Sequence, residues 1–177
     1  MNEIGILLGE KIRQHGNKLL GIAMAGVPIA TSIAINHNMS LCYTRKLAGV
    51  KSVEALQEYA SQYGEHSLVE GEIDDGDKFI AIDDIVTRFD SKLVAIKQLE
   101  MEAERKGKEI ECSHVAVVID RQQGAEEIAR QHGIKLHALI KFKEAMGWLR
   151  DEMAEDEYET IMDYLEEPEK YQKRVSR

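Results

Sequence analysis

Short apolar runs alternate along this chain with longer amphipathic segments. The apolar runs are typical of buried strands, and we expect strands at residues 19–23, 41–44, 78–82, 113–119 and 135–140. Around them, apolar residues recur at helical spacing, and we expect helices at residues 3–15, 28–37, 52–63, 91–106 and 124–132. Strands that alternate with helices form crossover units in a parallel sheet. The expected fold is therefore α/β, with a doubly wound, mainly parallel sheet.

The Asp74-Asp75-Gly76 turn is expected to interrupt this alternation. It separates two short runs of strand character, at residues 67–73 and 78–82. An Asp-Gly turn between such runs is typical of a hairpin. We therefore expect these two runs to pair as neighbouring antiparallel strands.

The chain is acidic, and its size suits one domain. It has 177 residues, enough for a substantial buried core, with a net charge of −9 and a pI near 5.2. Binding to a nucleic-acid backbone depends on clustered Lys and Arg, so we expect no nucleic-acid partner. A local anion site is still compatible with this charge, because a few basic residues can form a small positive patch. The candidates are Arg45, Lys46, Lys51 and Arg88.

Membrane association is not indicated by the sequence. No apolar run approaches the roughly 18 residues that a membrane-spanning helix needs. The opening residues, Met1-Asn2-Glu3, do not begin a signal segment with a basic and then an apolar part. We therefore expect no membrane partner and a cytoplasmic location.

The two cysteines, Cys42 and Cys112, each lie in or beside a strand-like run. Neither has a metal-ligand neighbour at the usual short spacing. We expect two buried free thiols and no metal ligands among the protein side chains.

The apolar run at residues 79–82 ends in two adjacent carboxylates, Asp83 and Asp84, and a short polar loop then leads into a helix. Carboxylates accept hydrogen bonds from the hydroxyls of a ribose, and the free backbone N–H groups of a helix start can hold a phosphate. Two acids after a strand are also ordinary for a turn and a helix start. These residues alone leave both interpretations open.

Residues 79–92 (FIAIDDIVTRFDSK) resemble the motif with which type I phosphoribosyltransferases bind phosphoribosyl pyrophosphate, PRPP. Further segments resemble the orotate phosphoribosyltransferase branch of that family, in the same order along the chain. They are residues 21–30 (GIAMAGVPIA), 42–46 (CYTRK), 117–124 (VVIDRQQG) and 132–137 (HGIKLH). The resemblance covers roughly residues 19–142. It implies the type I phosphoribosyltransferase fold, with a phosphoribosyltransferase-like domain at residues 1–142 and an acidic helical extension at residues 143–177.

The resemblance also implies an enzyme of pyrimidine biosynthesis that transfers phosphoribosyl from Mg-PRPP to orotate and releases pyrophosphate. Mg²⁺ would be its cofactor, carried with PRPP, and a homodimer its working form. The implied catalytic residues are Asp83, Asp84 and Lys46, with the two acids facing the ribose hydroxyls. Arg45 would neutralise the pyrophosphate together with Lys46, and Arg121 matches the position that contacts the base.

The remaining implied residues bind the phosphates of PRPP. By resemblance, Thr87, Arg88 and Ser91 hold the 5′-phosphate. Ala25 and Gly26 belong to the loop whose main-chain N–H groups approach the pyrophosphate, where small residues permit close contact.

The PRPP motif of this chain departs from the family pattern. Residues 87–91 read TRFDS, so both glycines of the family's phosphate-binding turn are replaced. Phe89 places a side chain where open space is expected. Asp90 places a carboxylate beside the phosphate position, which at about 4 Å costs on the order of 1 to 4 kcal/mol. Arg88 offsets this repulsion by pairing with Asp90 or by reaching the phosphate, and the sequence leaves both open.

The loop that follows the second strand departs as well. The family's loop Lys falls on Ser61, although Tyr63-Gly64 and residues 69–71 match the end of that loop. Lys51 is a candidate to replace the missing cation, and His66 is a candidate proton donor. The alternatives are a solvated lysine and a loop histidine without a function.

Residues 143–177 lie beyond the resemblance. Apolar residues recur there at helical spacing in a very acidic background, which predicts two amphipathic helices before Pro168. They are expected to cover the domain, to form a dimer contact or to bind a partner. The family's N-terminal hood, which supplies base contacts, has no counterpart in the short segment before residue 21.

Two functions follow from these residues. The first is an orotate phosphoribosyltransferase-like enzyme that uses PRPP and a nucleobase. The alternative is a non-catalytic protein of the same fold that binds a nucleotide, a phosphosugar or a protein partner in a regulatory role. The acids and basic residues of the motifs favour ligand binding under either.

Overall fold

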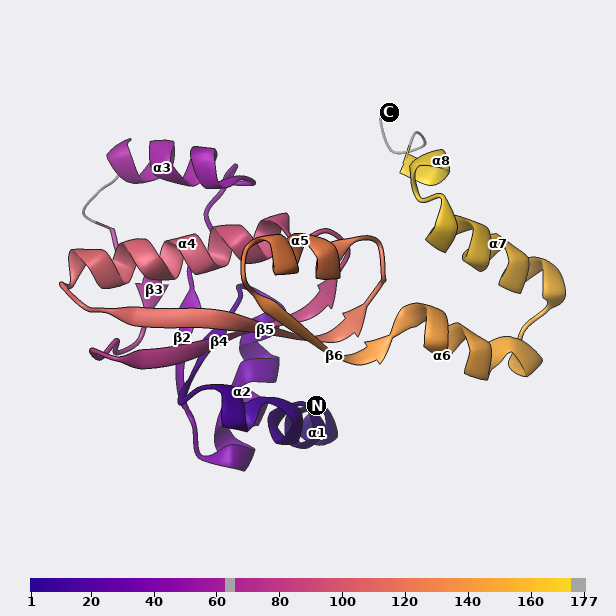
Figure 1. The fold of residues 1–177 in the computed structure, drawn as a ribbon, viewed down its shortest axis with the longest axis horizontal. Helices are drawn as coiled ribbons and strands as arrows, with labels where there is room; N and C mark the ends of the chain where they lie inside the picture. The colour runs from indigo at the N-terminus through magenta and orange to yellow at the C-terminus, as the bar shows by residue number, and fades with distance from the viewer. Residues whose placement is uncertain (63–65, 173–177) are drawn as a thin grey trace.

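The computed structural model describes residues 1–62 and 66–172, which form a six-stranded sheet with helices on both faces (Figure 1). The strand order is β3-β2-β1-β4-β5-β6, and every pairing is parallel except that of β3 with β2. The strands are β1 Lys18–Gly21, β2 Ser40–Thr44, β3 Val69–Glu70, β4 Asp77–Val86, β5 Ile110–Asp120 and β6 Lys135–Lys141. The expected doubly wound, mainly parallel α/β fold is confirmed.

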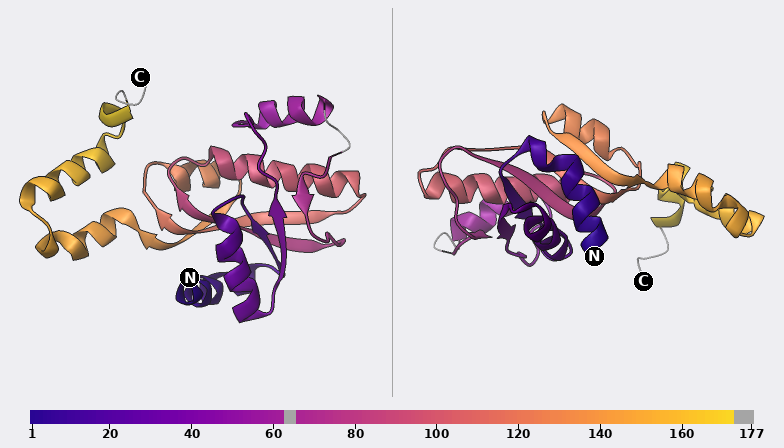
Figure 2. Two further views of the ribbon diagram at one scale, coloured as in Figure 1. Left: turned by 180° about the vertical axis from the view of Figure 1, so that it is seen from behind. Right: turned by 90° about the horizontal axis from the view of Figure 1, so that it is seen from below.

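Two helices cover each face of the sheet (Figures 1 and 2). On one face lie α1 Asn2–Ile12, followed by the short 3-10 helix η1 Arg13–His15, and α2 Gly26–His37. On the other face lie α4 Asp90–Arg105 and α5 Ala125–Gln131. α3 Val53–Gln62 packs on the outer side of α4, where Leu56 meets Leu68 and Val94. These helices lie close to their expected ranges.

Strand β4 occupies the centre of the sheet because it is apolar on both faces. Ile80 and Ile82 pack with α1 and α2, whereas Phe79 and Ala81 pack with α4. A strand buried on both faces needs a helix layer on each side. The run at residues 79–82 therefore determines where its carboxyl end, with Asp83, comes to lie.

The expected hairpin between residues 67–73 and 78–82 is wrong. β3 pairs with the edge strand β2, with Thr44 opposite Val69, and β4 pairs with β1 and β5. The turn at residues 74–76 exists, but it leads the chain from the edge of the sheet back to its centre. The reason is the burial of β4, because an edge hairpin would leave one of its sides without a partner strand.

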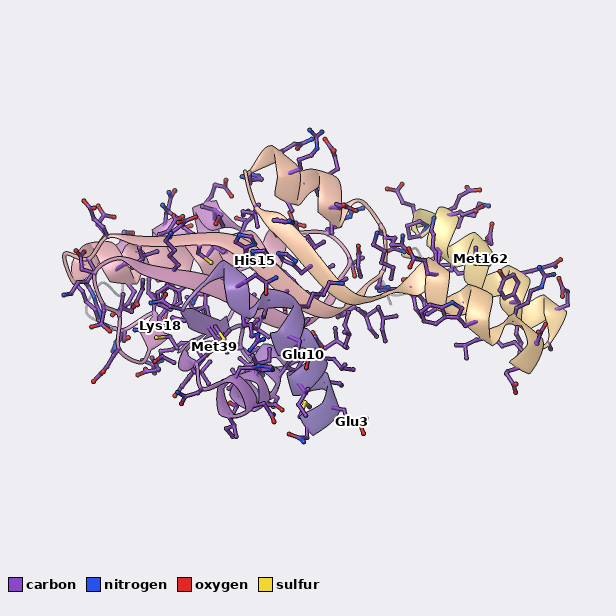
Figure 3. The ribbon with its side chains drawn as sticks, turned by 60° about the horizontal axis from the view of Figure 1, so that its bottom comes forward. Glu3, Glu10, His15, Lys18, Met39 and Met162 are labelled. Atoms are coloured by element: carbon purple, nitrogen blue, oxygen red, sulfur yellow. The ribbon has the colours of Figure 1, made fainter. Side chains whose placement is uncertain are left out.

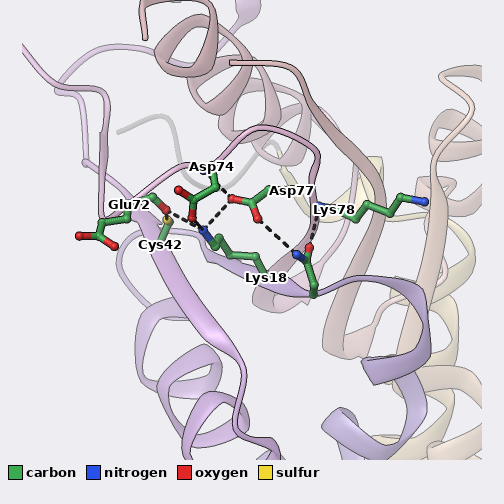
Figure 4. A network of polar contacts seen from close by, with 7 residues as sticks. Lys18, Cys42, Glu72, Asp74, Asp77 and Lys78 are labelled. Atoms are coloured by element: carbon green, nitrogen blue, oxygen red, sulfur yellow. Dashed lines mark hydrogen bonds and ion pairs between the residues drawn. The ribbon is translucent and has the colours of Figure 1, made fainter. Parts of the chain in front are cut away.

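A buried ion-pair network anchors this returning segment (Figure 4). The Lys18 ammonium lies 2.6 Å from Asp77 Oδ2 and 3.0 Å from Asp74 Oδ2, and it donates to the Glu72 carbonyl at 3.0 Å. The side chains of Lys18 and Asp77 are each 6% exposed. Burial disfavours both charges, but their mutual hydrogen bonds outweigh it, so the pKa of Lys18 is raised and that of Asp77 is lowered.

Both cysteines are free thiols, as expected. Cys42 is buried and donates to the Glu72 carbonyl, whereas Cys112 is half-buried. Burial raises the pKa of both thiols, that of Cys112 to about 12. Each thiol therefore stays protonated and unreactive at neutral pH.

The chain continues beyond β6 into α6 Phe142–Leu149, the 3-10 helix η2 Arg150–Glu152, α7 Glu155–Glu166 and α8 Glu169–Gln172. These helices extend away from the sheet and then turn back toward it (Figures 1 and 2). The expected amphipathic helices before Pro168 correspond to α6 and α7. Within the described residues, none of the helices is long and apolar enough to cross a membrane.

Removal of the buried cation at Lys18 should destabilise the fold. We expect Lys18→Met to lower the free energy of unfolding by about 3 kcal/mol, because Asp77 is left as an unpaired buried charge. Urea unfolding at pH 7 measures this. Lys78→Met is the matched control, since Lys78 is 65% exposed and its distance to Glu111 is 4.0 Å. Equal losses in the two variants would contradict the prediction.

Candidate active site

A cleft of about 700 Å³ opens at the carboxyl ends of β1, β2 and β4. In open parallel sheets, ligands bind at this edge. The cleft brings together most of the site residues expected from the sequence. These are Arg45, Lys46, Asp83, Asp84, Thr87, Arg88 and Ser91.

The two acids are held by the backbone that follows them. Asp83 Oδ1 accepts a hydrogen bond from the N–H of Asp84 at 2.9 Å, and Asp84 Oδ1 accepts one from the N–H of Ile85 at 2.7 Å. Asp83 is 8% exposed, whereas Asp84 is half-buried. Asp84 is thus the more accessible of the two carboxylates from the cleft.

Lys92, in the first turn of α4, pairs with Asp83 and was not singled out from the sequence. Its ammonium donates to Asp83 Oδ2 at 2.8 Å, to the Ile85 carbonyl at 2.7 Å and to Ser91 Oγ at 3.3 Å. Lys92 is 4% exposed. Burial raises the pKa of the Asp83 carboxyl, and the charge of Lys92 opposes that rise. The spacing of Lys92 from Ile96 and Leu99 could have identified it. The three residues are four and three positions apart, so they share the buried face of α4.

Phe89 lies in the hydrophobic core and not in the phosphate-binding turn. Its side chain is 0% exposed and belongs to the cluster between α4 and the sheet. The expectation that it fills the open space of the turn is therefore wrong. Its backbone has φ −99° and ψ −1°, which any residue can adopt, so a glycine is not needed there.

The start of α4 faces the cleft, and among the described residues no partner is found for the N–H groups of Asp90 and Ser91, whereas that of Lys92 donates to the Phe89 carbonyl. No side chain in the described part of the chain caps this helix start. Asp90 and Ser91 are exposed and line the cleft. The N–H groups of the first turn favour binding of an anion, whereas the negative charge of Asp90 disfavours it.

Among the described residues, Arg88 pairs with α8 and not with Asp90, which was one of the two contacts considered from the sequence. Its Nη2 lies 3.7 Å from Glu169 Oε1 of α8, and both side chains are largely exposed. An exposed pair at this distance contributes little to stability. Arg88 still lines the cleft, and only a weak contact has to break for it to reach a ligand.

The end of β2 carries the cations of the opposite wall. The N–H of Arg45 donates to the Leu68 carbonyl and its carbonyl accepts from Gln98 Nε2, both at 3.0 Å. The Arg45 guanidinium lies 3.6 Å from Glu70, with both side chains nearly half exposed. Among residues 1–62 and 66–172, neither Lys46 nor Lys51 forms an ion pair, and both line the cleft. The four basic residues of the expected positive patch, Arg45, Lys46, Lys51 and Arg88, thus all line the same cleft.

Ala25 and Gly26 do not line the cleft, whereas Ile22 and Ala23 of the same loop do. The N–H of Ala23 donates to Thr44 Oγ1 at 3.0 Å, and the Ala23–Met24 peptide is cis. A Cβ on Gly26 would lie 2.1 Å from the Ile82 carbonyl oxygen. Gly26 therefore allows α2 to start directly against β4.

Arg121 follows β5 and lies beside the cleft without lining it. Its Nη1 is 3.5 Å from Thr87 Oγ1, and its Nη2 donates to the Tyr164 hydroxyl of α7. The guanidinium also lies 5.0 Å from the centroid of the Tyr164 ring. A second cavity of about 480 Å³ adjoins this point. The cavity is lined by the loops that follow β4 and β5, by the start of α6 and by the C-terminal helices. The lining residues are Thr87, Arg88, Gln122, Gln123, Lys143, Leu165, Glu166, Glu167, Pro168, Glu169 and Lys170.

The other loop candidates lie outside the cleft or outside the described residues. Ser61 is exposed on α3, where its hydroxyl donates to the Glu58 carbonyl at 2.7 Å. His66 is exposed and does not line the cleft. Tyr63 and Gly64 lie outside the described residues. Since α3 packs on α4, it leaves the cleft open.

Comparisons with known proteins agree with this geometry. The chain is 31% identical over 140 residues to the orotate phosphoribosyltransferase of Pyrococcus furiosus, covering 77% of this chain and 67% of that protein. It is 29% identical over 141 residues to that of Methanocaldococcus jannaschii, covering 80% and 70%. No family model matches the chain.

Solved structures show the same fold. Leishmania donovani UMP synthase superposes with a TM-score of 0.74 at 21% identity, over 94% of this chain and 33% of that one. The Mycobacterium tuberculosis orotate phosphoribosyltransferase in complex with PRPP gives a TM-score of 0.59 at 22% identity, over 79% and 72%.

Loss of the Lys92 ammonium should destabilise the protein in a pH-dependent way. We expect Lys92→Met to lower the free energy of unfolding by about 3 kcal/mol at pH 7, because Asp83 is left charged and unpaired. The loss should shrink as pH falls, since the variant raises the pKa of buried Asp83 further and protonation then removes its charge. Urea unfolding between pH 7 and pH 5 measures both effects. A pH-independent loss, or an equal loss in the partly exposed control Lys97→Met, would contradict this prediction.

Proposed function

The chain belongs to the orotate phosphoribosyltransferase family, and from this premise we propose that it transfers phosphoribosyl from PRPP to orotate. The bond between the ribose C1 and the pyrophosphate oxygen breaks, and pyrophosphate leaves with the electron pair. A nitrogen of the base forms the new bond to C1 and gives up its proton. The observation that carries the proposal is the single cleft in which paired acids, a free helix start and several cations meet. The family resemblance drawn from the sequence is confirmed by its relatives.

We assign the ribose hydroxyls to Asp84. Its carboxylate is half-buried at the cleft and keeps one oxygen without a backbone hydrogen bond to Ile85. Asp83 is instead held by Lys92, so its role is to fix the start of the turn at residues 85–91. The resemblance placed both acids at the ribose hydroxyls, and we propose that Asp84 contacts the ligand while Asp83 positions the turn.

The 5′-phosphate is assigned to the start of α4. The backbone N–H groups there and the hydroxyls of Thr87 and Ser91 supply donors without the two glycines of the family motif. Arg88 can leave its weak pair with Glu169 and add positive charge. Asp90 subtracts from the affinity.

The pyrophosphate is assigned to the opposite wall, beside Arg45 and Lys46. Positive charge develops on the ribose while negative charge builds on the leaving group, so fixed cations stabilise the transition state more than the ground state. Ile22 and Ala23 line the cleft on the same side, with their N–H groups bonded to the Ile82 carbonyl and to Thr44 Oγ1. Ala25 and Gly26 then act by shaping the loop.

The donor set of the cleft fits Mg²⁺ carried with PRPP. Magnesium prefers carboxylate and phosphate oxygens, and Asp84 presents a carboxylate at the cleft. When bound, the ion neutralises the charge of the pyrophosphate. The protein's own residues position the ribose and the leaving group around it.

The base is assigned to the side of Arg121, next to the second cavity. Tyr164 and Thr87 hold the guanidinium in place, and α7 and α8 close that side. We further propose the homodimer expected from the resemblance as the working form.

Calorimetric titration with Mg-PRPP, followed by addition of orotate and assay of released pyrophosphate, tests the proposal. We expect saturable binding and turnover. Asp84→Asn should lower kcat/KM by about 10²-fold, since it removes a charged contact to the reacting sugar. The control Asp151→Asn changes an exposed acid of η2 and should leave activity unchanged. A folded protein that binds PRPP without releasing pyrophosphate, or that fails to bind at millimolar PRPP, would overturn the assigned activity.

Removal of the carboxylate at Asp90 should strengthen PRPP binding. Relief of about 1 kcal/mol of repulsion corresponds to an approximately fivefold lower dissociation constant. Calorimetry of Asp90→Asn at low salt measures it, with Asp156→Asn in α7 as the control for loss of one acid at a helix start. Weaker binding by Asp90→Asn would mean that this acid takes part in holding the ligand or its metal ion.

A further inference from the structure

Three histidines from distant parts of the chain meet on the sheet face that α1 covers. His15 ends η1, His114 lies in β5 and His137 lies in β6. One ring nitrogen of each lies within 4.8 Å of the others, and His114 Nδ1 is 2.9 Å from His137 Nε2. Figure 3 shows His15 beside the sheet, where the chain leaves α1.

The three rings form a stack open to solvent on one side. Their centroids are 4.5, 4.9 and 5.2 Å apart. His15 and His114 are half-buried, whereas His137 is 7% exposed. An ion therefore has access from the side of His15, and His137 forms the floor of the site.

The surroundings of His114 and His137 disfavour a positive charge on these rings. Burial lowers the pKa of His114 and lowers that of His137 to about 4, and the neighbouring histidines and Lys135 act in the same direction. A neutral imidazole keeps a lone pair on one ring nitrogen, which is the form that binds metal ions.

We propose that His15, His114 and His137 form a binding site for a divalent transition-metal ion such as Zn²⁺. Imidazole nitrogens are ligands that Zn²⁺, Cu²⁺ and Ni²⁺ share, and three histidines leave a fourth position for water. Tetrahedral Zn–N bonds of 2.0–2.1 Å place ligand nitrogens about 3.3 Å apart. The 2.9 Å between His114 Nδ1 and His137 Nε2 is close to this value, and a bound ion would replace the proton of that hydrogen bond. His15 Nε2 now lies 3.1 Å from Gln14 Nε2, and rotation of the His15 ring would complete the set.

The site is separate from the catalytic cleft. His114 pairs with Lys135, the first residue of β6, and lies six residue steps before Asp120 at the carboxyl end of β5, which corresponds to about 20 Å. A metal ion here links η1 to β5 and β6 and thereby stabilises the fold. Lys11 and Lys135 add positive charge nearby and Glu111 negative charge, so we expect micromolar affinity.

Metal titration of the chelator-treated full chain tests the site. We expect one Zn²⁺ per chain by calorimetry, a higher Tm with Zn²⁺, and Co²⁺ absorption bands of a low-coordinate nitrogen site. His15→Gln and His114→Gln should each weaken binding at least tenfold. The matched control His132→Gln changes an exposed histidine outside the cluster and should bind as the parent does.

His15→Gln keeps the test sharp, because His15 is half-buried at the end of a short helix and its loss is compatible with folding. No binding at 100 µM Zn²⁺ would overturn the proposal, as would unchanged affinity in folded His15→Gln. Since PRPP binds at the other edge of the sheet, its affinity should be the same with and without Zn²⁺. Failure of the orotate assay would leave this proposal standing.

Discussion

Burial of β4 on both faces is the constraint on which the rest of the structure depends. Phe79 and Ala81 on one side, and Ile80 and Ile82 on the other, require a helix layer on each face and a strand on each edge. Once β4 is central, its carboxyl end lies between the ends of β1 and β5. The same constraint therefore sets the fold and the place of the cleft.

Because β4 is central, a charged carboxylate at its end, that of Asp83, is unfavourable in free energy. Asp83 is largely removed from water, and an isolated buried charge is strongly unfavourable. Lys92 offsets this cost with an ammonium that also binds the Ile85 carbonyl. At the opposite end of the strand, Lys18 does the same for Asp77. Buried lysines thus fix both ends of the central strand and hold the turn at the cleft.

Features that depend on the local spacing of apolar residues were predicted from the sequence. Features that depend on contacts between distant parts of the chain were missed. Hydrophobic spacing located the helices and the core strands, and the family motifs located the cleft. The pairing of β3 with β2 was missed because an Asp-Gly turn carries no information about which strand occupies the edge. Phe89 was misplaced because a motif gives position along the chain but not side-chain direction. The histidine cluster was missed because its members are 99 and 23 residues apart in sequence.

Two side chains hold Arg121, and the base-binding role that we propose for it depends on its remaining donors. A guanidinium has five N–H donors, and Thr87 and Tyr164 occupy one on each terminal nitrogen. Among the described residues, no partner is found for the other three donors, which suit the planar, anionic base that we propose, and the Tyr164 ring lies 5.0 Å from the guanidinium. Thr87 belongs at the same time to the turn assigned to the 5′-phosphate. The positions that we propose for the base and for the 5′-phosphate are therefore connected through one hydroxyl, which would favour a fixed relative orientation of the two substrates.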